Sequence, residues 1–301
     1  MDRIDEWRVF VTVATHLSFT RAARALGRSP QAITRAVAAL EARVGTRLLN
    51  RTTRAVSLSS DGERYLVRSR RALLELDALE ARPDASAALR GTIAVTAPVL
   101  FGQLHVMPVV EEFLRRNPEL DARVSLLDRV VSLAEEGFDL GVRIGALPDS
   151  PLRASRVGSV RAVICASPAY LRRRGQPRSP DDLSTHDCIA FAGTTPIAGR
   201  WTFPRAGGRD RHVAVRARMI VDVGQAAIDA ALAGLGLVRV LSYQVDRLVR
   251  EKKLRIVLAD HEGPPVPVHV VHLPGVQSRA ASAFAELASE RLRARLLTRG
   301  S

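Results

Sequence analysis

The side chains best suited to chemistry in this sequence are basic, and they lie close together near its start. Between Arg21 and Arg71 the chain carries 12 Arg and three acidic residues, and the whole 301-residue chain has a net charge of +14. A concentrated cluster of cations is typical of modules that bind a polyanion, most often a nucleic acid. The other interpretation is a solvated, arginine-rich face, and charge alone favours neither.

The segment 18–45 has the form of a helix-turn-helix. The small pair Ala22–Ala23 allows two helices to cross closely, and Gly27 provides the tight turn between them. Ile33 and Val37 face inward on the second helix. Three polar side chains then point outward near the N-terminal end of that helix, which is the end that enters a major groove: Gln31, Thr34 and Arg35. An ordinary αα-hairpin is the alternative, but the turn, the apolar stripe and the basic surroundings together favour DNA binding.

A second group of polar residues lies where strands meet helices further along the chain. Thr96–Pro98 joins a predicted strand to a helix N-terminus, and Asp222–Gln225 occupies the matching position later on. Exposed N–H groups and the helix dipole at such turns favour an anion. Three charged side chains lie at neighbouring strand ends: Asp128, Arg129 and Arg143. The alternative for each is a satisfied turn or a surface ion pair.

The remaining reactive residue types do not form a catalytic pattern. Cys165 lies in an apolar strand and Cys188 is isolated, while His269 and His272 are spaced to point to opposite faces of a strand. The sequence contains no P-loop, no nucleophile elbow and no paired metal ligands. We therefore predict no catalytic residue, no metal site and no cofactor, and we expect that the chain is not an enzyme.

The first 82 residues are predicted to be helical apart from a short hairpin. Ser18 and Ser29 are suited to cap helices, with Pro30 at a first helical position and Gly45 as a stop. Ser60 and Glu63 match a capping box for a fourth helix, which Pro83 terminates. The expected helices are 4–15, 19–26, 30–44 and 60–82, with a hairpin at 48–58.

From residue 90 onward the pattern changes to strands alternating with helices. The expected strands are 93–96, 122–127, 140–144, 160–166, 213–221, 235–241, 254–258 and 266–272. The expected helices are 99–116, 130–136, 168–174, 225–233, one that Ser242 caps, and one from Ser278 to about 297. The order strand, polar turn, helix, strand occurs twice, which predicts two α/β lobes with a ligand between them.

The fourth helix carries a heptad seam. The small and apolar residues that recur at steps of three and four are Gly62, Tyr65, Ser69, Ala72, Leu76 and Leu79. The segment 61–82 would extend about 33 Å as a helix, and one isolated helix cannot bury such a stripe. We therefore expect it to pair with a second subunit, with packing on its own domain as the alternative.

Composition excludes several classes of protein. The chain is 47% hydrophobic and contains both signs of charge, which argues against disorder, and it has two Cys, which argues against a disulfide scaffold. The most apolar stretch, 223–241, is broken by polar and glycine residues, so a membrane span is not expected. The start of the chain does not resemble a signal peptide, and a cytoplasmic location is therefore expected.

These motifs resemble those of LysR-type transcriptional regulators. The stretch 40–54, Leu-Glu-Ala-Arg-Val-Gly-Thr-Arg-Leu-Leu-Asn-Arg-Thr-Thr-Arg, is highly specific for their winged helix-turn-helix. Four further stretches are similar to their effector-binding domain: 97–102, 135–140, 143–145 and 166–171. The chain departs from the family at Pro30–Gln31, where many members have Gln-Pro, and this inversion makes a base contact by Gln31 less secure.

The resemblance implies roles for individual residues. Thr34 and Arg35 would read base edges, Arg35 with guanine. Phosphate contacts would come from cations and hydroxyls around them: Ser18, Thr20, Arg28, Ser29, Arg51, Thr52 and Arg54. Pro30 and Gln31 complete the expected DNA-binding set. The inducer cleft would be lined by Thr96, Ala97, Pro98, Asp128, Arg129, Arg143 and Asp222; the usual hydroxyl of the first turn falls near Pro98, so Thr96 would have to replace it.

The expected protein has an N-terminal all-α winged helix-turn-helix with a long linker helix, followed by a two-lobed α/β effector domain like those of periplasmic binding proteins. The expected divisions are 1–59 for DNA binding, 60–89 for the dimerising helix and hinge, and 90–301 for the effector, with lobe I at 90–162 and 267–301 and lobe II at 163–266. The expected partners are a palindromic DNA operator, a small-molecule effector, RNA polymerase and further copies in a homodimer or homotetramer.

For the effector, a small organic anion is favoured over a neutral or amine-bearing metabolite. Two other functions suit a two-lobed fold of this kind: a small-molecule binding protein or a transferase. An exported binding protein would be expected to carry a signal peptide, which the start of the chain does not resemble, and a transferase would not need the basic helix-turn-helix. A ligand-independent architectural DNA binder would leave the α/β domain without a role.

Overall fold

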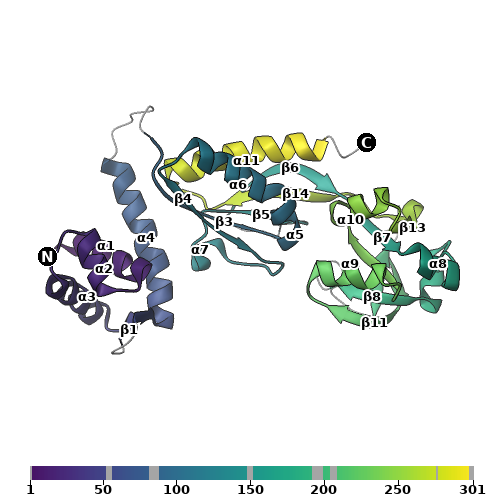
Figure 1. Cartoon of the computed structure of the whole chain (residues 1–301), viewed down its shortest axis with the longest axis horizontal. Coiled ribbons are helices and arrows are strands. Elements are labelled where there is room, and N and C mark those ends of the chain that lie inside the picture. Colours follow the sequence, from purple (N-terminus) through teal and green to yellow (C-terminus); the bar gives the residue numbers. More distant parts are fainter. Residues whose placement is uncertain are drawn as a thin grey trace.

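The computed structural model describes residues 2–51, 56–80, 88–147, 152–191, 199–203, 209–275 and 277–297. Three bodies follow one another along its longest axis (Figure 1). A helical module holds the N-terminus, a five-stranded sheet with its helices forms the middle, and a second five-stranded sheet forms the far end. No helix among these residues combines the length and apolarity needed to cross a membrane.

The N-terminal module is a helix-turn-helix followed by a small antiparallel hairpin. Its elements are α1 (Arg3–His16), α2 (Phe19–Ala25), α3 (Pro30–Val44), β1 (Leu49–Arg51), β2 (Val56–Leu58) and α4 (Ser60–Glu80). The predicted caps are confirmed, because Ser18 Oγ accepts the Arg21 N–H and Ser29 Oγ accepts the Ala32 N–H. Gly45 has a φ of +76°, a left-handed conformation that suits glycine at a helix end.

The start of α4 differs from its prediction by one residue. Ser59, not Ser60, provides the cap: its Oγ accepts the Gly62 N–H at 2.9 Å, and its carbonyl accepts the Glu63 N–H. The Ser59 hydroxyl also donates to Arg47 O, which ties the helix to the hairpin. The predicted end of this helix near residue 82 and the terminating Pro83 lie outside the described residues.

The N-terminal part of the predicted dimer seam packs against the N-terminal module of the same chain. A Cβ at Gly62 would lie 1.9 Å from the Leu48 carbonyl oxygen, so α4 touches the hairpin backbone there. Tyr65 packs edge-on to Phe10 and accepts a hydrogen bond from the indole of Trp7. These residues therefore follow the alternative, packing on their own domain.

The rest of the seam is less enclosed by the single chain. Ser69 is buried, but Ala72 and Leu76 are only partly covered. The side chain of Leu79 lies outside the described residues. Among the seam residues whose side chains are described, Ala72 and Leu76 are therefore the ones left partly uncovered for a second subunit.

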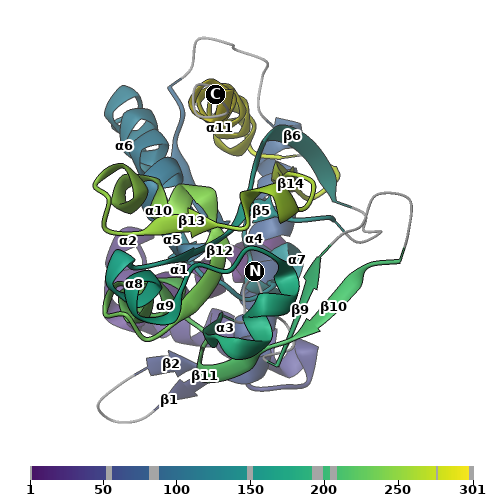
Figure 2. The same ribbon diagram turned by 90° about the vertical axis from the view of Figure 1, so that its right-hand side faces the viewer.

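The first α/β lobe contains a sheet of strand order β4-β3-β5-β14-β6. Its strands are β3 (Gly91–Ala97), β4 (Leu120–Leu126), β5 (Leu140–Ile144), β6 (Arg153–Val160) and β14 (Val266–His272). Three helical segments continue one another, α5 (Val99–Phe101), the π-helical turn η1 (Gly102–Val106) and α6 (Met107–Arg116). With α11 (Arg279–Leu297) they cover one face, and α7 (Leu133–Glu136) covers the other (Figure 2).

The second lobe contains a sheet of order β11-β8-β12-β7-β13. Its strands are β7 (Ala162–Ala166), β8 (Asp187–Phe191), β11 (Arg216–Val221), β12 (Leu237–Leu241) and β13 (Arg255–Val257). One face carries α9 (Gly224–Leu232) and α10 (Ser242–Arg250). The other carries α8 (Pro168–Arg174) and a hairpin of β9 (Arg200–Phe203) and β10 (Arg211–Ala214).

Two predicted strands are wrong, because each contains a switch between sheets. The expected strand 160–166 is divided at Arg161 between β6 in the first lobe and β7 in the second. A reciprocal pair of bonds stabilises this break, since Arg161 N donates to Ser242 Oγ and Ser242 N donates to Arg161 O. The expected strand 213–221 is likewise divided between β10 and β11.

Several other elements were missed or begin elsewhere. Strands β8 and β9 were not expected, and neither was most of β6. The helix predicted at 130–136 begins at Leu133, because Ser132 Oγ accepts the Glu135 N–H. Strands β5 and β14 and helix α8 have the predicted bounds.

Candidate functional site

Helix α3 presents the polar face that the sequence predicts. Ile33, Val37 and Leu40 are completely buried in the module core, so the opposite face of the helix is fixed toward solvent. The side chains of Gln31 and Arg35 are exposed on it. A helix held in this way can place its N-terminal residues against base edges.

Three of the predicted hydroxyl residues already make a hydrogen bond inside the module: Ser18, Ser29 and Thr34. Thr34 is exposed, but its Oγ1 donates to the Pro30 carbonyl at 2.9 Å, so toward DNA it acts as an acceptor. The Oγ atoms of Ser18 and Ser29 accept the helix N–H groups described above and retain their own O–H groups as donors. Thr20 is exposed on α2.

One predicted phosphate ligand is engaged by an acid. The Arg28 guanidinium donates to both oxygens of Asp5, each at 2.7 Å. These hydrogen bonds hold the pKa of the Asp5 carboxyl below its usual range. Both side chains remain partly exposed, and the pair offsets part of the positive charge at the start of α3.

The hairpin is attached to α3 by a residue that we did not predict as functional. The Glu41 carboxylate accepts the backbone N–H groups of Leu48 and Leu49 at 2.9 and 3.0 Å. Glu41 therefore fixes where β1 begins relative to α3. Arg51 belongs to β1 but its side chain, with Thr52 and Arg54, lies outside the described residues.

In the first lobe, the turn after β3 contains the most enclosed of the predicted effector residues. Thr96 and Ala97 are completely buried, and Pro98 precedes α5. Among the described residues, the Thr96 Oγ1 has no hydrogen-bond partner. A buried hydroxyl without a partner costs free energy, so this atom is a candidate ligand contact.

The helix N-terminus beside Thr96 is not open to an anion as expected. Asp128 Oδ1 accepts the Val99 N–H at 2.9 Å, so a carboxylate of the chain itself occupies this position. Arg129, predicted as a cation of the cleft, donates to both carboxylate oxygens of Glu136 at 2.8 and 2.7 Å. Both residues thus have internal partners, as the alternative of a satisfied turn or ion pair describes.

Arg143 and Asp222 differ in their surroundings. Arg143 is partly buried on β5 and donates to the carbonyls of Val142 and Val131, and burial lowers the pKa of its guanidinium. Asp222 is exposed after β11. Helix α9 follows it, and the residue before that helix, Val223, makes no side-chain cap.

An aromatic cluster between the two lobes was not predicted. Tyr243, from α10 of the second lobe, packs edge-on to Phe101 of α5 with centroids 5.2 Å apart. The His105 ring lies 4.7 Å from Phe101 and 5.8 Å from Tyr243. Burial raises the pKa of the Tyr243 hydroxyl, and the negative charge of Asp128 raises it further. The cluster therefore connects α10 of the second lobe to α5 and η1 of the first lobe.

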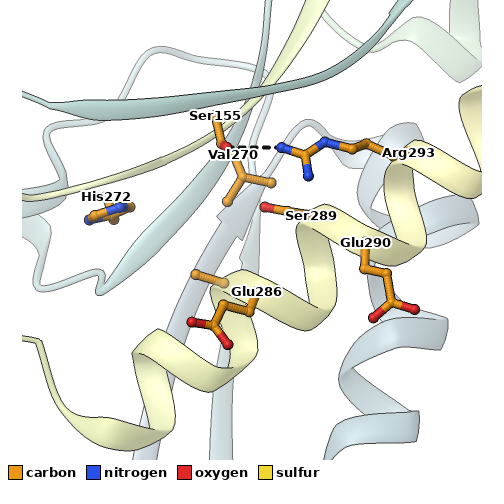
Figure 3. A pocket seen from close by; sticks show the side chains of 8 residues that line it. Ser155, Val270, His272, Glu286, Ser289, Glu290 and Arg293 are labelled. Carbon is orange, nitrogen blue, oxygen red and sulfur yellow. Dashed lines mark hydrogen bonds between the residues drawn. The ribbon is translucent and has the colours of Figure 1, made fainter.

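A separate cavity of about 480 Å³ lies between α11 and the strands β6 and β14 (Figure 3). Its lining includes Ser155, His272, Glu286, Ser289 and Arg293, and Arg293 donates to Ser155 Oγ across it. None of the predicted effector residues lines this cavity.

The fold defines a class: a winged helix-turn-helix joined by a long helix to a two-lobed α/β ligand-binding domain. A family profile described as "Bacterial regulatory helix-turn-helix protein, lysR family" matches residues 4–63, and one described as "LysR substrate binding domain" matches residues 86–293. The chain belongs to the LysR family of transcriptional regulators.

Individual relatives agree with this assignment. The HTH-type transcriptional regulator PgrR of Escherichia coli K12 is 34% identical over 286 residues, covering 94% of this chain and 95% of the relative. The structure of CrgA, a LysR-type regulator from Neisseria meningitidis, is 30% identical with a TM-score of 0.59, covering 95% and 98% of the two chains. LysG from Corynebacterium glutamicum, solved with a bound effector Arg, is 18% identical with a TM-score of 0.59, covering 97% and 98%, and shows the fold alone.

Proposed function

We propose that α3 reads the operator sequence and that the surrounding cations and hydroxyls hold the phosphates. The observation that carries this proposal is the exposed polar face of α3, which the buried stripe on the other side fixes toward solvent. Thr34 and Arg35 are the proposed base readers, with Gln31 beside them. The proposed phosphate set is Ser18, Thr20, Arg28, Ser29, Arg51, Thr52 and Arg54, with Pro30 shaping the helix start.

Binding measurements on two duplexes test these roles. Arg35→Ala should cost about 1–3 kcal/mol on the native operator and relax one base position, while Arg54→Ala should weaken operator and random DNA alike and reduce the salt slope. Arg64→Ala, an exposed arginine paired with Asp61 on α4, is the matched control and should change neither. Equal losses on both duplexes for Arg35→Ala would remove it from base reading.

The effector is proposed to bind between the lobes, against Thr96, Ala97 and Pro98 on one side and the turn at Asp222 on the other. The buried Thr96 hydroxyl supports this position. The N-terminus of α9 and the Arg143 guanidinium favour a small organic anion. Arg129 would join them only by leaving Glu136. The second candidate is an amine-bearing metabolite, which the Asp128 carboxylate favours.

Thermal-shift screening of the full chain against carboxylates and amines separates the two candidates. A ligand that binds the folded state raises the melting temperature by mass action. Thr96→Val keeps the shape of the side chain but removes its hydroxyl, so it should reduce the melting-temperature shift that the ligand causes. Thr92→Val, at an exposed position of the same strand, should leave that shift unchanged. If only amines stabilise the protein, the proposal that the effector is an organic anion is wrong.

The assembly is proposed to be a homodimer or homotetramer on a palindromic operator, paired through the partly covered part of α4 around Ala72 and Leu76. The proposed divisions are 1–59, 60–89 and 90–301. Effector binding shifts the population of lobe arrangements, which changes DNA spacing and contact with RNA polymerase. In this proposal the chain works in the cytoplasm as a regulator and not as an enzyme.

A further inference from the structure

The central strand of the second lobe contains a charged residue. Strand β12 pairs with β7 on one side and β8 on the other, and Leu237, Val238 and Val240 on it are completely buried. Arg239 lies among them and is partly buried. Burial of a cation in a central strand is costly, so its environment must compensate.

Two aromatic rings of the β9–β10 hairpin hold the Arg239 side chain. The guanidinium carbon lies 4.5 Å from the ring centroid of Phe203 and 5.1 Å from that of Trp201. One N–H donates to the Thr202 carbonyl at 2.9 Å. Burial lowers the pKa of Arg239 to about 10, so the group stays charged at neutral pH. The result is a pre-positioned cation on the face of the sheet opposite α9.

This cation lies in the wall of a cavity of about 190 Å³. Apolar walls come from Ile164, Phe203 and Leu258. Glu262 also lines it, but its carboxylate accepts hydrogen bonds from Arg161 at 3.0 and 3.3 Å. A mostly apolar cavity with a few placed polar groups is the usual form of a small-molecule site. At about 30 Å³ per water, it has room for a ligand of roughly six non-hydrogen atoms.

The cavity lies beside the two segments that cross between the lobes. Ala162, the first residue of β7, lines it, and so does Gly263, which precedes β14. None of the residues proposed to bind the effector contributes to it. A ligand in this cavity would therefore occupy a second site, apart from the one near Thr96.

We propose that this cavity binds a small organic monocarboxylate, whose charged group meets Arg239 and whose apolar part lies against Ile164, Phe203 and Leu258. A planar carboxylate matches the fork of guanidinium N–H groups, whereas a neutral amide of the same shape lacks the charge.

Trp201 fluorescence provides the test. The sequence contains two tryptophans, Trp7 and Trp201, so replacing Trp7 leaves Trp201 as the single reporter. In a Trp7→Phe background, titration with butyrate should change the Trp201 emission saturably and raise the melting temperature. Butyramide, the neutral probe of the same shape, should bind at least tenfold more weakly. Equal binding of the two probes would overturn charge recognition.

Three variants assign the response to this cavity. Arg239→Met removes the charge, and Ala162→Phe fills the cavity while leaving Arg239 in place; each should weaken butyrate binding at least tenfold. Arg255→Met, at an exposed position of β13, is the matched control and should bind as the parent does. Thr96→Val should also leave butyrate binding unchanged, which separates this site from the proposed effector site.

If Arg239→Met fails to fold, Ala162→Phe still decides the matter. Unchanged butyrate binding by a folded Ala162→Phe protein would overturn the proposal, as would a loss of binding in Thr96→Val. A butyrate response that disappears in Ala162→Phe and persists in Arg255→Met supports it.

Discussion

Replacing Asp128 by Asn should reveal the charge of the effector. Asp128 Oδ1 accepts the Val99 N–H at the start of α5, next to the buried Thr96. Aspartate and asparagine are about equally good acceptors for such helix N–H groups. Asp128→Asn can therefore keep the hydrogen bond while it removes one negative charge from this end of the proposed effector site, so the melting temperature without ligand should change little.

The magnitude follows from Coulomb's law. For a ligand charge about 6 Å from the carboxylate, the interaction is about 0.7 kcal/mol in water and about 3 kcal/mol at an effective dielectric constant of about 20. Asp128 is exposed, so screening places the effect toward the lower value, about 0.7–1.4 kcal/mol. This corresponds to an affinity change of about threefold to tenfold.

The sign of the change identifies the ligand class. Asp128→Asn should tighten binding of a carboxylate by that factor and weaken binding of an amine by the same factor. Isothermal titration at low and high salt measures both, and the effect should shrink at high salt. Asp121→Asn, an exposed acid on β4, is the control variant. If the best carboxylate from the screen binds the variant and the parent equally, a charge near Asp128 is not part of the site.

Three further results are expected. Asp5→Asn should remove the carboxylate charge that pairs with Arg28 and steepen the salt dependence of binding to random duplex, by up to the slope of about one phosphate contact; an unchanged slope measured by anisotropy would exclude Arg28 from phosphate binding. Leu76→Asp should reduce the oligomer in light scattering, and retention of the parent's size would exclude this part of α4 from the interface. His186 is buried beside the Tyr170 hydroxyl, and burial lowers its pKa below the ordinary 6.5. The unfolded state then takes up the proton first, so the free energy of unfolding should fall as pH drops below about 6.5; His186→Asn should flatten this fall in thermal scans, and an identical pH profile would contradict it.

Elements with local signals were predictable from the sequence. The helix-turn-helix depends on Ser18, Ser29 and Gly45, each of which acts on residues within one helical turn. Strand β6 was largely missed, and β7 was joined to it. The two belong to different sheets, and the separation at Arg161 depends on Ser242, which lies 81 residues further along the chain. No pattern near residue 161 contains that partner.

The sequence by itself determined which face of α3 is polar and which turns follow the strands, because helical and strand periodicity are local properties. Only the tertiary structure decided which of those polar groups have partners. Asp128 accepts the Val99 N–H, and Arg28 is paired with Asp5, across separations of 29 and 23 residues. Likewise, Tyr243 reaches Phe101 only because α10 packs across the lobes. The sequence specifies each charged group and hydroxyl. Whether that group is available to DNA or to a ligand depends on which distant atoms the fold brings within hydrogen-bond distance.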